Sequence, residues 1–251
     1  MLIPAQDVYS FWLVRTKGVV HVGAHLAEEA SLYRKFFFGP VIWIEAQPNL
    51  VRILQDQIKP PDKVLQALVW NEPGVYKTLR LASNSQSSSV FDFGTHEVSH
   101  PEVVFTGEIE LRTSTLMDVL PDGLSNYLLV LDIQGAEYEA LQGLGKKIEM
   151  FDYVYCEVGR RGVFMQTHEV FDIDSLLSEA GFLRVATMWT RADWGDALYV
   201  KKNLVSDVYG GNIQLFARMA IYKIWSTVRM SRLASFTHKH LRNLLSRNTA
   251  R

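Results

Sequence analysis

Cysteine is almost absent from this sequence, since Cys156 is the only one in 251 residues. A single thiol excludes an intramolecular disulfide, so we expect a reducing compartment. No apolar run approaches the roughly 20 residues that a membrane-spanning helix requires. The first residues lack the basic start and continuous apolar core of a secretion signal. Together these absences predict a cytoplasmic protein.

Acidic residues are scarce at one end of the chain. Residues 201–251 hold ten Lys and Arg but only Asp207 as an acid, although the formal net charge of the whole chain is −1. Apolar residues recur there at helical spacing from Ile213 to Val228, with Arg218 and Arg229 on the other side. This basic amphipathic pattern fits an anionic membrane surface, a protein partner, or the chain's own domain. No nucleic-acid-reading module accompanies it, so nucleic acid is not an expected partner.

A complete G-x-G-x-x-G fingerprint is also missing. Residues 18–22 read as a buried strand, residues 23–25 as a turn and residues 27–38 as a helix. Only the first glycine, Gly23, is present, and His25 and Glu28 occupy the places of the other two. A pyrophosphate requires very close backbone approach at such a turn. The turn is therefore easier to reconcile with an adenosyl sulfonium than with a dinucleotide.

Strand and helix signals alternate along the first 203 residues. The sequence predicts strands at 41–45, 63–70, 74–82, 127–133 and 151–158, and helices at 48–58, 136–144 and 172–182, the last capped by Asp172 or Asp174. The stretch up to residue 111 has weak periodicity. Two final strands, at 184–189 and 196–202, are separated by a turn too short for a helical crossover, so they are expected to be antiparallel. The pattern predicts a mostly parallel α/β sheet in one domain, residues 1–203, followed by a basic tail, residues 204–251.

Glu45 is the first candidate for a binding residue. It ends the second predicted strand, 22 residues after Gly23. A carboxylate at that place can accept both ribose hydroxyls of an adenosine, as in NAD and S-adenosylmethionine sites. The alternative is a surface glutamate beside an ordinary turn.

Two further carboxylates follow central strands. Asp132 lies where the strand at 127–133 emerges, and Glu157 lies near the end of the next strand. Because ligands of open α/β sheets bind beyond the carboxyl ends of strands, Asp132 is a candidate general base or hydroxyl-orienting group, with a helix cap as the alternative. We expect Glu137 to be structural, in the first turn of a helix. No His or Cys joins these acids at metal-ligand spacing, so no metal site is predicted.

A polar loop at 83–89, followed by His96 and His100, is the last candidate feature. Its hydroxyls can line a cleft, and either histidine can act as a base near neutral pH. The alternative is a flexible loop with structural or merely exposed histidines. Cys156 alternates away from Glu157 and is expected to be a core thiol.

These segments, in order, resemble the FkbM family of S-adenosylmethionine-dependent methyltransferases. The resemblance covers about residues 18–202 and depends most on "LDIQGAEYEALQG" and the closing "WGDALYVKK", with "HVGAH" and "VIWIEA" in support. It implies a class I methyltransferase fold: a Rossmann-like, seven-stranded, mostly parallel sheet with an antiparallel last strand, plus a C-terminal helical extension.

The resemblance also implies roles for particular residues. Gly23, Ala24 and His25 would form the cofactor turn, Glu45 would hold the ribose, and Ala67 would lie near the adenine. Family members often carry Asp where His21 stands and Gly where Ala27 stands.

We therefore expect S-adenosylmethionine as cofactor and methyl transfer to a hydroxyl, most of all on a sugar of a glycan or glycolipid. Asp132 leads as the residue that orients or deprotonates the hydroxyl and also contacts the cofactor, with Glu157 or His96 second. A small natural-product acceptor is the nearest alternative. A non-catalytic binding protein is another, based on His21 and Ala27, and a dehydrogenase is the third.

Overall fold

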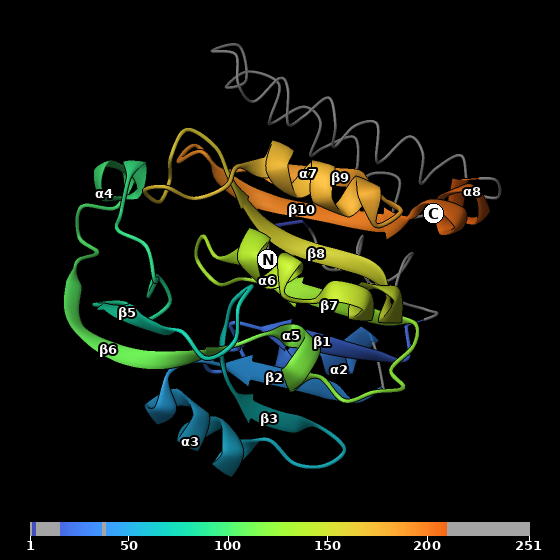
Figure 1. Cartoon of the computed structure of the whole chain (residues 1–251), viewed down its shortest axis with the longest axis horizontal. Coiled ribbons are helices and arrows are strands. Elements are labelled where there is room, and N and C mark those ends of the chain that lie inside the picture. The colour runs from blue at the N-terminus through green and yellow to red at the C-terminus, as the bar shows by residue number, and fades with distance from the viewer. Residues whose placement is uncertain (1, 4–15, 37–38, 210–251) are drawn as a thin grey trace, which may run out of the picture.

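The computed structural model describes residues 2–3, 16–36 and 39–209, and a seven-stranded sheet forms its centre (Figure 1). In spatial order the strands are β3 (Lys63–Gln66), β2 (Val41–Glu45), β1 (Gly18–Val22), β7 (Tyr127–Leu131), β8 (Phe151–Gly159), β10 (Trp194–Lys201) and β9 (Phe182–Trp189). Strand β1 is parallel to β2 and β7, whereas β10 is antiparallel to β8 and β9. The predicted class I sheet with an antiparallel last strand is confirmed.

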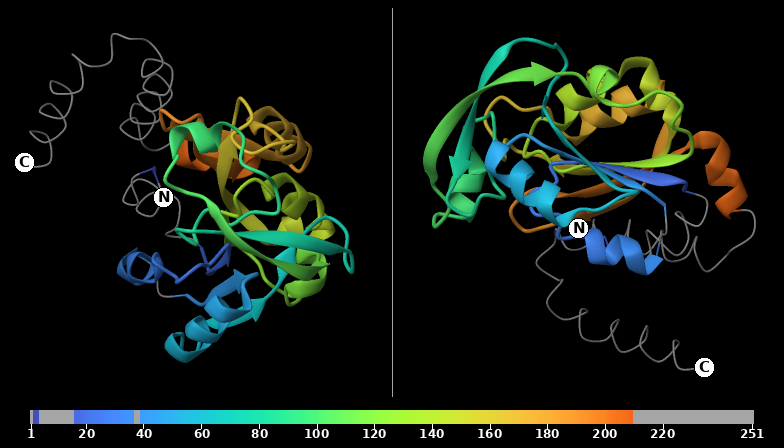
Figure 2. Two further views of the ribbon diagram at one scale, coloured as in Figure 1. Left: turned by 90° about the vertical axis from the view of Figure 1, so that its left-hand side faces the viewer. Right: turned by 90° about the horizontal axis from the view of Figure 1, so that it is seen from below.

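Helices cover both faces of this sheet (Figure 2). One face carries α5 (Leu116–Val119), α6 (Glu137–Gln142) and α7 (Val170–Glu179), and a 3-10 helix, η2 (Gly145–Met150), follows α6. The other face carries α2 (Ala30–Phe36), α3 (Pro48–Gln57) and α8 (Lys202–Tyr209). Every residue of β1, β2 and β7 is buried, which explains why these strands read as continuous apolar runs.

Helix α7 begins earlier than the sequence predicts. Its N-cap is Glu169, and Asp172 lies in the first turn, where its side chain accepts the Glu169 backbone N–H at 2.9 Å. The predicted caps, Asp172 and Asp174, are therefore wrong. The early start places Val170 in line with Ile173 on the buried face of the helix.

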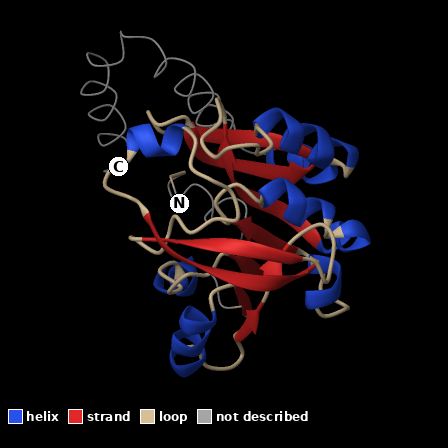
Figure 3. Ribbon diagram, turned by 60° about the vertical axis from the view of Figure 1, so that its left-hand side comes forward, coloured by secondary structure: helices blue, strands red, loops and turns tan. Residues whose placement is uncertain are grey.

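A second, three-stranded sheet lies beyond the carboxyl ends of the parallel strands (Figures 1 and 3). It consists of β4 (Leu68–Val69), β6 (Phe105–Ser114) and β5 (Tyr76–Ala82), and the short helix α4 (Thr95–Ser99) precedes β6. The single strand predicted at 63–70 is thus wrong, because the chain leaves the main sheet at Ala67 and then pairs with β6. The weak periodicity before residue 111 hides the ten-residue strand β6, most of which is exposed or half-buried.

Helix α2 begins at Ala30, three residues after the predicted start. Ala27 has a φ of 57°, in the left-handed region, so the turn after β1 is longer than the sequence indicates. No helix of the described ranges is long and apolar enough to cross a bilayer. The basic amphipathic segment predicted from Ile213 to Val228 lies outside the described residues, and α8 runs through the proposed domain boundary at residue 203.

Candidate active site

Gly23 brings the ends of β1 and β7 into close contact. It has a φ of 83°, and a Cβ on this residue would overlap the carbonyl oxygen of Asp132 and lie 2.8 Å from its carbonyl carbon. The Asp132 N–H donates to the Val22 oxygen at 3.1 Å, directly beside this contact. Position 23 must therefore be glycine for the backbone of Asp132 to lie against the turn.

The backbone N–H groups of the turn are already used within the protein. Gly23 and Ala24 donate to the Ile44 oxygen. His25 donates to the Glu45 side chain, Leu26 to the Glu28 side chain, and Ala27 to the Ala24 oxygen. A pyrophosphate site offers free N–H groups to its anion. This turn offers none from residue 23 to residue 27, which disfavours a dinucleotide.

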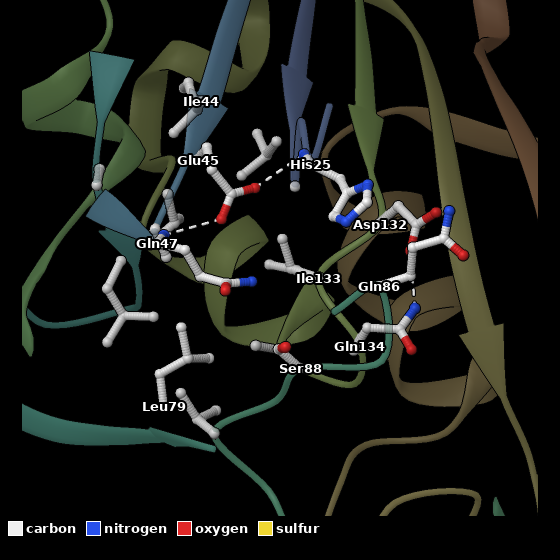
Figure 4. Close-up of a pocket in the computed structure, with 18 of the residues that line it drawn as sticks. His25, Ile44, Glu45, Gln47, Leu79, Gln86, Ser88, Asp132, Ile133 and Gln134 are labelled. Carbon is white, nitrogen blue, oxygen red and sulfur yellow. Dashed lines mark hydrogen bonds between the residues drawn. The ribbon is translucent and has the colours of Figure 1, made fainter. Parts of the chain in front are cut away.

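Glu45 lies at the carboxyl end of β2 with its side chain 6% exposed. Its two oxygens accept the N–H groups of His25 and Gln47, each at 2.8 Å (Figure 4). Burial raises the pKa of this carboxyl group. Each oxygen keeps a further lone pair, so a ribose hydroxyl can donate to it.

The first cavity surrounds Glu45. Its walls are mostly apolar and include Ile44, Ala67, Leu79, Val90 and Ile133, and no Lys or Arg of the described residues lines it (Figure 4). Ser85, Gln86 and Ser88 bring the polar loop to its rim. Ala24 lines neither this cavity nor the second one described below, because its side chain is buried in the core.

The turn after β1 is tied to the polar loop. His25 Nε2 lies 2.6 Å from Ser85 Oγ, and His25 Nδ1 lies 2.6 Å from the Glu28 carboxylate. Ser85 has a φ of 58°, so the loop turns sharply at this contact. His25 thus connects the two segments that close the first cavity.

A second, more polar cavity adjoins the first and shares Gly23, His25, Gln86, Asp132 and Gln134 with it. Glu157, His96 and His100 also line it. Three candidates chosen from the sequence, Asp132, Glu157 and His96, are therefore brought together in one cavity. Asp132 is the only one of the three that also borders the first cavity.

Gln134 connects the two central carboxylates. Its Nε2 donates to Asp132 Oδ1 at 2.8 Å and to Glu157 Oε2 at 2.9 Å. Burial, and after it the negative charge of Asp132, raise the pKa of Glu157 well above its usual range. Sequence reasoning missed Gln134, although it lies inside the "D-x-Q-G" motif.

His96 lies in α4 and is 6% exposed. Its ring stacks on Phe93 at 4.4 Å and on Phe164 at 5.6 Å between centroids. Nδ1 is buried without a hydrogen-bond partner among the described residues. Burial, and then the neighbouring His100, lower the pKa of His96, so its neutral form is favoured.

Glu137 supports the site from behind. Its carboxylate accepts the N–H groups of Ile133 at 2.9 Å and Gly135 at 3.0 Å, which fixes the turn that follows Asp132. Burial raises the pKa of Glu137 to about 8. Cys156 is fully buried, and burial raises the pKa of its thiol. Within the described ranges no group of three or more His, Cys, Asp or Glu could hold a metal.

The sequence model of the methyltransferase FkbM domain matches residues 21–184. The chain belongs to the FkbM methyltransferase family. It is a methyltransferase, and its cofactor is S-adenosylmethionine. The first cavity fits this cofactor for two reasons. Glu45 and the apolar walls suit its adenosine, and the absence of Lys and Arg from the described lining suits its cationic sulfonium.

Solved methyltransferase structures resemble the FkbM domain only distantly. Magnesium protoporphyrin IX methyltransferase from Synechocystis is 12% identical, with a TM-score of 0.45 over 79% of this chain and 78% of that chain. The 1,6-didemethyltoxoflavin-N1-methyltransferase of Burkholderia thailandensis is 10% identical, with a TM-score of 0.45 over 79% and 77%. Precorrin-6y C5,15-methyltransferase from Geobacter metallireducens is 11% identical, with a TM-score of 0.43 over 79% and 86%. A comparison with curated proteins finds no match.

Proposed function

We propose that this methyltransferase transfers the methyl group to a hydroxyl oxygen, on a saccharide or another polyol. One observation carries the proposal: the cavity that suits the adenosine and the polar cavity beside it meet at Asp132. A carboxylate at that junction is placed to hold a hydroxyl next to the transferred methyl group.

When bound, the cofactor would supply an electrophilic methyl group to an acceptor oxygen. Asp132 accepts the proton that the hydroxyl loses. Gln134 holds the Asp132 carboxylate through the 2.8 Å hydrogen bond and thereby orients it. His96 also lines the second cavity, and its neutral form is favoured because burial lowers its pKa.

Calorimetric titration tests the cofactor half of the proposal. Purified protein is titrated separately with S-adenosylmethionine and NAD, together with Glu45→Gln and the exposed control Glu72→Gln. We expect micromolar binding of S-adenosylmethionine alone, weakened about 10- to 100-fold by Glu45→Gln, because one charge-assisted hydrogen bond is worth about 1.5–3 kcal/mol. Equal weakening by both variants, or binding of NAD, would refute the assignment.

Methyl transfer itself is tested with labelled S-adenosylmethionine and a panel of saccharides. We expect Asp132→Asn to lower kcat more than it raises KM, because the proton acceptor acts in the transition state. A base-stable O-methyl ether is the expected product. Labelled N-methyl or carbon-methyl products would refute the hydroxyl as acceptor.

We also propose that the basic tail, residues 204–251, brings this domain to an anionic membrane surface from the cytoplasmic side, which would suit a lipid-linked saccharide. The proposal is supported by the eight Lys and Arg of residues 204–251 against one acid. Vesicles containing anionic lipid should bind the full chain and not a chain ending at residue 203. Equal binding of both chains would contradict it.

A further inference from the structure

The polar loop at 83–89 follows β5 and forms part of the wall of both cavities; Gln86 and Ser88 are labelled in Figure 4. Gln86 lines both cavities. Ser85 and Ser88 line the first cavity, and Asn84 and Ser87 line the second. The position of this one loop therefore sets the shape of both cavities.

The two ends of the polar loop are anchored to the rest of the domain. The Ser83 N–H donates to the Val104 oxygen at 2.8 Å, directly before β6. At the other end, Ser89 Oγ donates to the Gln134 oxygen at 2.7 Å, in the turn that follows β7. The tip of the loop, residues 84–88, therefore lies between two fixed ends.

The tip reaches the turn after β1 through two side chains. Ser85 Oγ lies 2.6 Å from His25 Nε2. Gln86 Nε2 donates to the Glu28 carboxylate at 3.4 Å, which is long for such a bond. The contact between Ser85 and His25 is thus the stronger attachment of the tip to this turn.

His25 connects this attachment to the carboxylate that suits the ribose. Its N–H donates to Glu45 Oε2 at 2.8 Å, and its Nδ1 lies 2.6 Å from the Glu28 carboxylate. Burial alone would raise the pKa of Glu28, but the hydrogen bond from His25 and others lower it, so this carboxylate is ionised. An ionised carboxylate only accepts hydrogen bonds, so Nδ1 carries a proton and the ring is held with Nε2 toward Ser85.

The backbone of His25 depends on these contacts. Its φ is 45°, in the left-handed region. A ribose hydroxyl that donates to Glu45 would fix the carboxylate whose Oε2 accepts the His25 N–H. Order at Glu45 would therefore pass to the His25 ring and from there to the tip of the loop.

We propose that His25 is a positioning residue, which couples ribose binding at Glu45 to closure of the polar loop over both cavities. This coupling rests on the proposed function and adds the order in which the site forms, with the cofactor first and the closed loop second. Coupling between sites is reciprocal. The factor by which the cofactor stabilises the closed loop is therefore the factor by which loop closure tightens cofactor binding.

Amide hydrogen exchange of the full-length protein, followed by mass spectrometry, measures closure of the loop. The ligands are S-adenosylhomocysteine, adenosine, and 2′,3′-dideoxyadenosine, which lacks both ribose hydroxyls. We expect the first two, at saturation, to slow exchange of residues 84–88 about 10-fold. The dideoxy compound should not slow it, because it has no hydroxyl to donate to Glu45.

Two variants at position 25 separate the contacts of the ring. In His25→Gln the amide nitrogen lies near the place of Nε2 and can reach Ser85, whereas in His25→Asn it lies near the place of Nδ1 and can reach only Glu28. Asparagine also adopts the left-handed backbone readily, so His25→Asn adds little strain. A merely structural histidine would make the two variants equivalent.

Loss of the contact should remove both sides of the coupling. We expect His25→Asn and Ser85→Ala to abolish the slowing of exchange by S-adenosylhomocysteine and to weaken its binding about 10-fold. His25→Gln should keep most of both effects. The matched control for Ser85→Ala is Ser175→Ala, at an exposed serine of α7, which should change neither.

The outcomes separate two failures. If S-adenosylhomocysteine does not bind the unaltered protein, the cofactor half of the proposed function fails and the coupling falls with it. If it binds while exchange of residues 84–88 is unchanged, the coupling alone is overturned. Equal slowing by adenosine and 2′,3′-dideoxyadenosine, or equal losses in His25→Asn and His25→Gln, would also overturn it.

Discussion

Replacing Gly23 with alanine tests how closely β1 and β7 must approach to form the site. Gly23 and Gly123 share almost the same backbone conformation, with φ of 83° and 81°. A Cβ on Gly23 would overlap the Asp132 carbonyl, whereas a Cβ on Gly123 would meet no atom within 4 Å. Gly123→Ala is therefore a matched control that carries the same dihedral strain without the clash.

The two substitutions should differ by several kcal/mol. An alanine in the left-handed region costs about 1 kcal/mol, which is the whole expected effect of Gly123→Ala. Gly23→Ala adds the separation of two strand ends and loss of the buried hydrogen bond from Asp132 to Val22, which costs about 1–3 kcal/mol. With the accompanying loss of packing, we expect Gly23→Ala to lower the free energy of unfolding by roughly 3–5 kcal/mol.

Urea denaturation followed by tryptophan fluorescence measures both variants, since the chain has six tryptophans. Calorimetry on the folded variants should show cofactor binding lost in Gly23→Ala and kept in Gly123→Ala. If the two unfolding free energies agree within about 0.5 kcal/mol, strand approach does not require glycine and the reasoning is refuted.

Three further perturbations have expected outcomes from the same structure. Glu137 holds a proton up to about pH 8 when folded and releases it at its usual pKa when unfolded, so stability should fall as pH rises through this window. Glu137→Gln should flatten that slope by about 1.4 kcal/mol per pH unit in urea denaturation at pH 5 to 8, and an unchanged slope would contradict the assignment. Glu169→Ala removes the side chain that accepts the N–H groups of Asp172 and Arg161, and should cost about 1–2 kcal/mol. Exposed Glu179→Ala should cost under about 0.5 kcal/mol, and equal costs would contradict the cap. Ala27→Gly removes an alanine from the left-handed backbone region and should change the free energy of unfolding by less than about 0.5 kcal/mol. Ala140→Gly, at a buried position of α6, should lower it by about 2 kcal/mol, and thermal unfolding measures both variants.

The main sheet could be predicted because its central strands are buried on both faces. Residues 18–22, 41–45 and 127–131 are mostly apolar, with His21 inside the first and Glu45 at the end of the second, which is the pattern of a parallel strand between two helix layers. The change of sheet at Ala67 could not be predicted, because the residues on both sides of it continue one apolar run. Strand β6 was missed since alternation fades where both faces are partly exposed.

The residues of the site that lie at the ends of strands could be predicted from the sequence. Glu45, Asp132 and Glu157 were chosen because the carboxyl ends of parallel strands meet at one edge, and the structure brings each of them to the lining of a cavity there. Gln134 and Asp196, both of which line the second cavity, were missed for different reasons. The role of Gln134 exists only between two carboxylates from different strands, and Asp196 lies inside a strand that reads as apolar.

The structure explains how a histidine is accommodated at position 21. This matters because family members often carry aspartate there, and that difference is the main argument for a non-catalytic protein. The ring is buried, Nδ1 lies 2.8 Å from the Tyr33 hydroxyl, and the ring stacks on Trp43 at 5.1 Å. Burial lowers the pKa of His21, so its neutral form is favoured. An aspartate at this position would add a further carboxylate to the second cavity, which Asp132, Glu157 and Asp196 already line, and each like charge makes ionisation of the others more costly. A neutral ring in its place lowers that repulsion while leaving Asp132 at the junction of the two cavities. The substitution therefore changes the charge of the site and does not remove the groups that the proposed reaction uses.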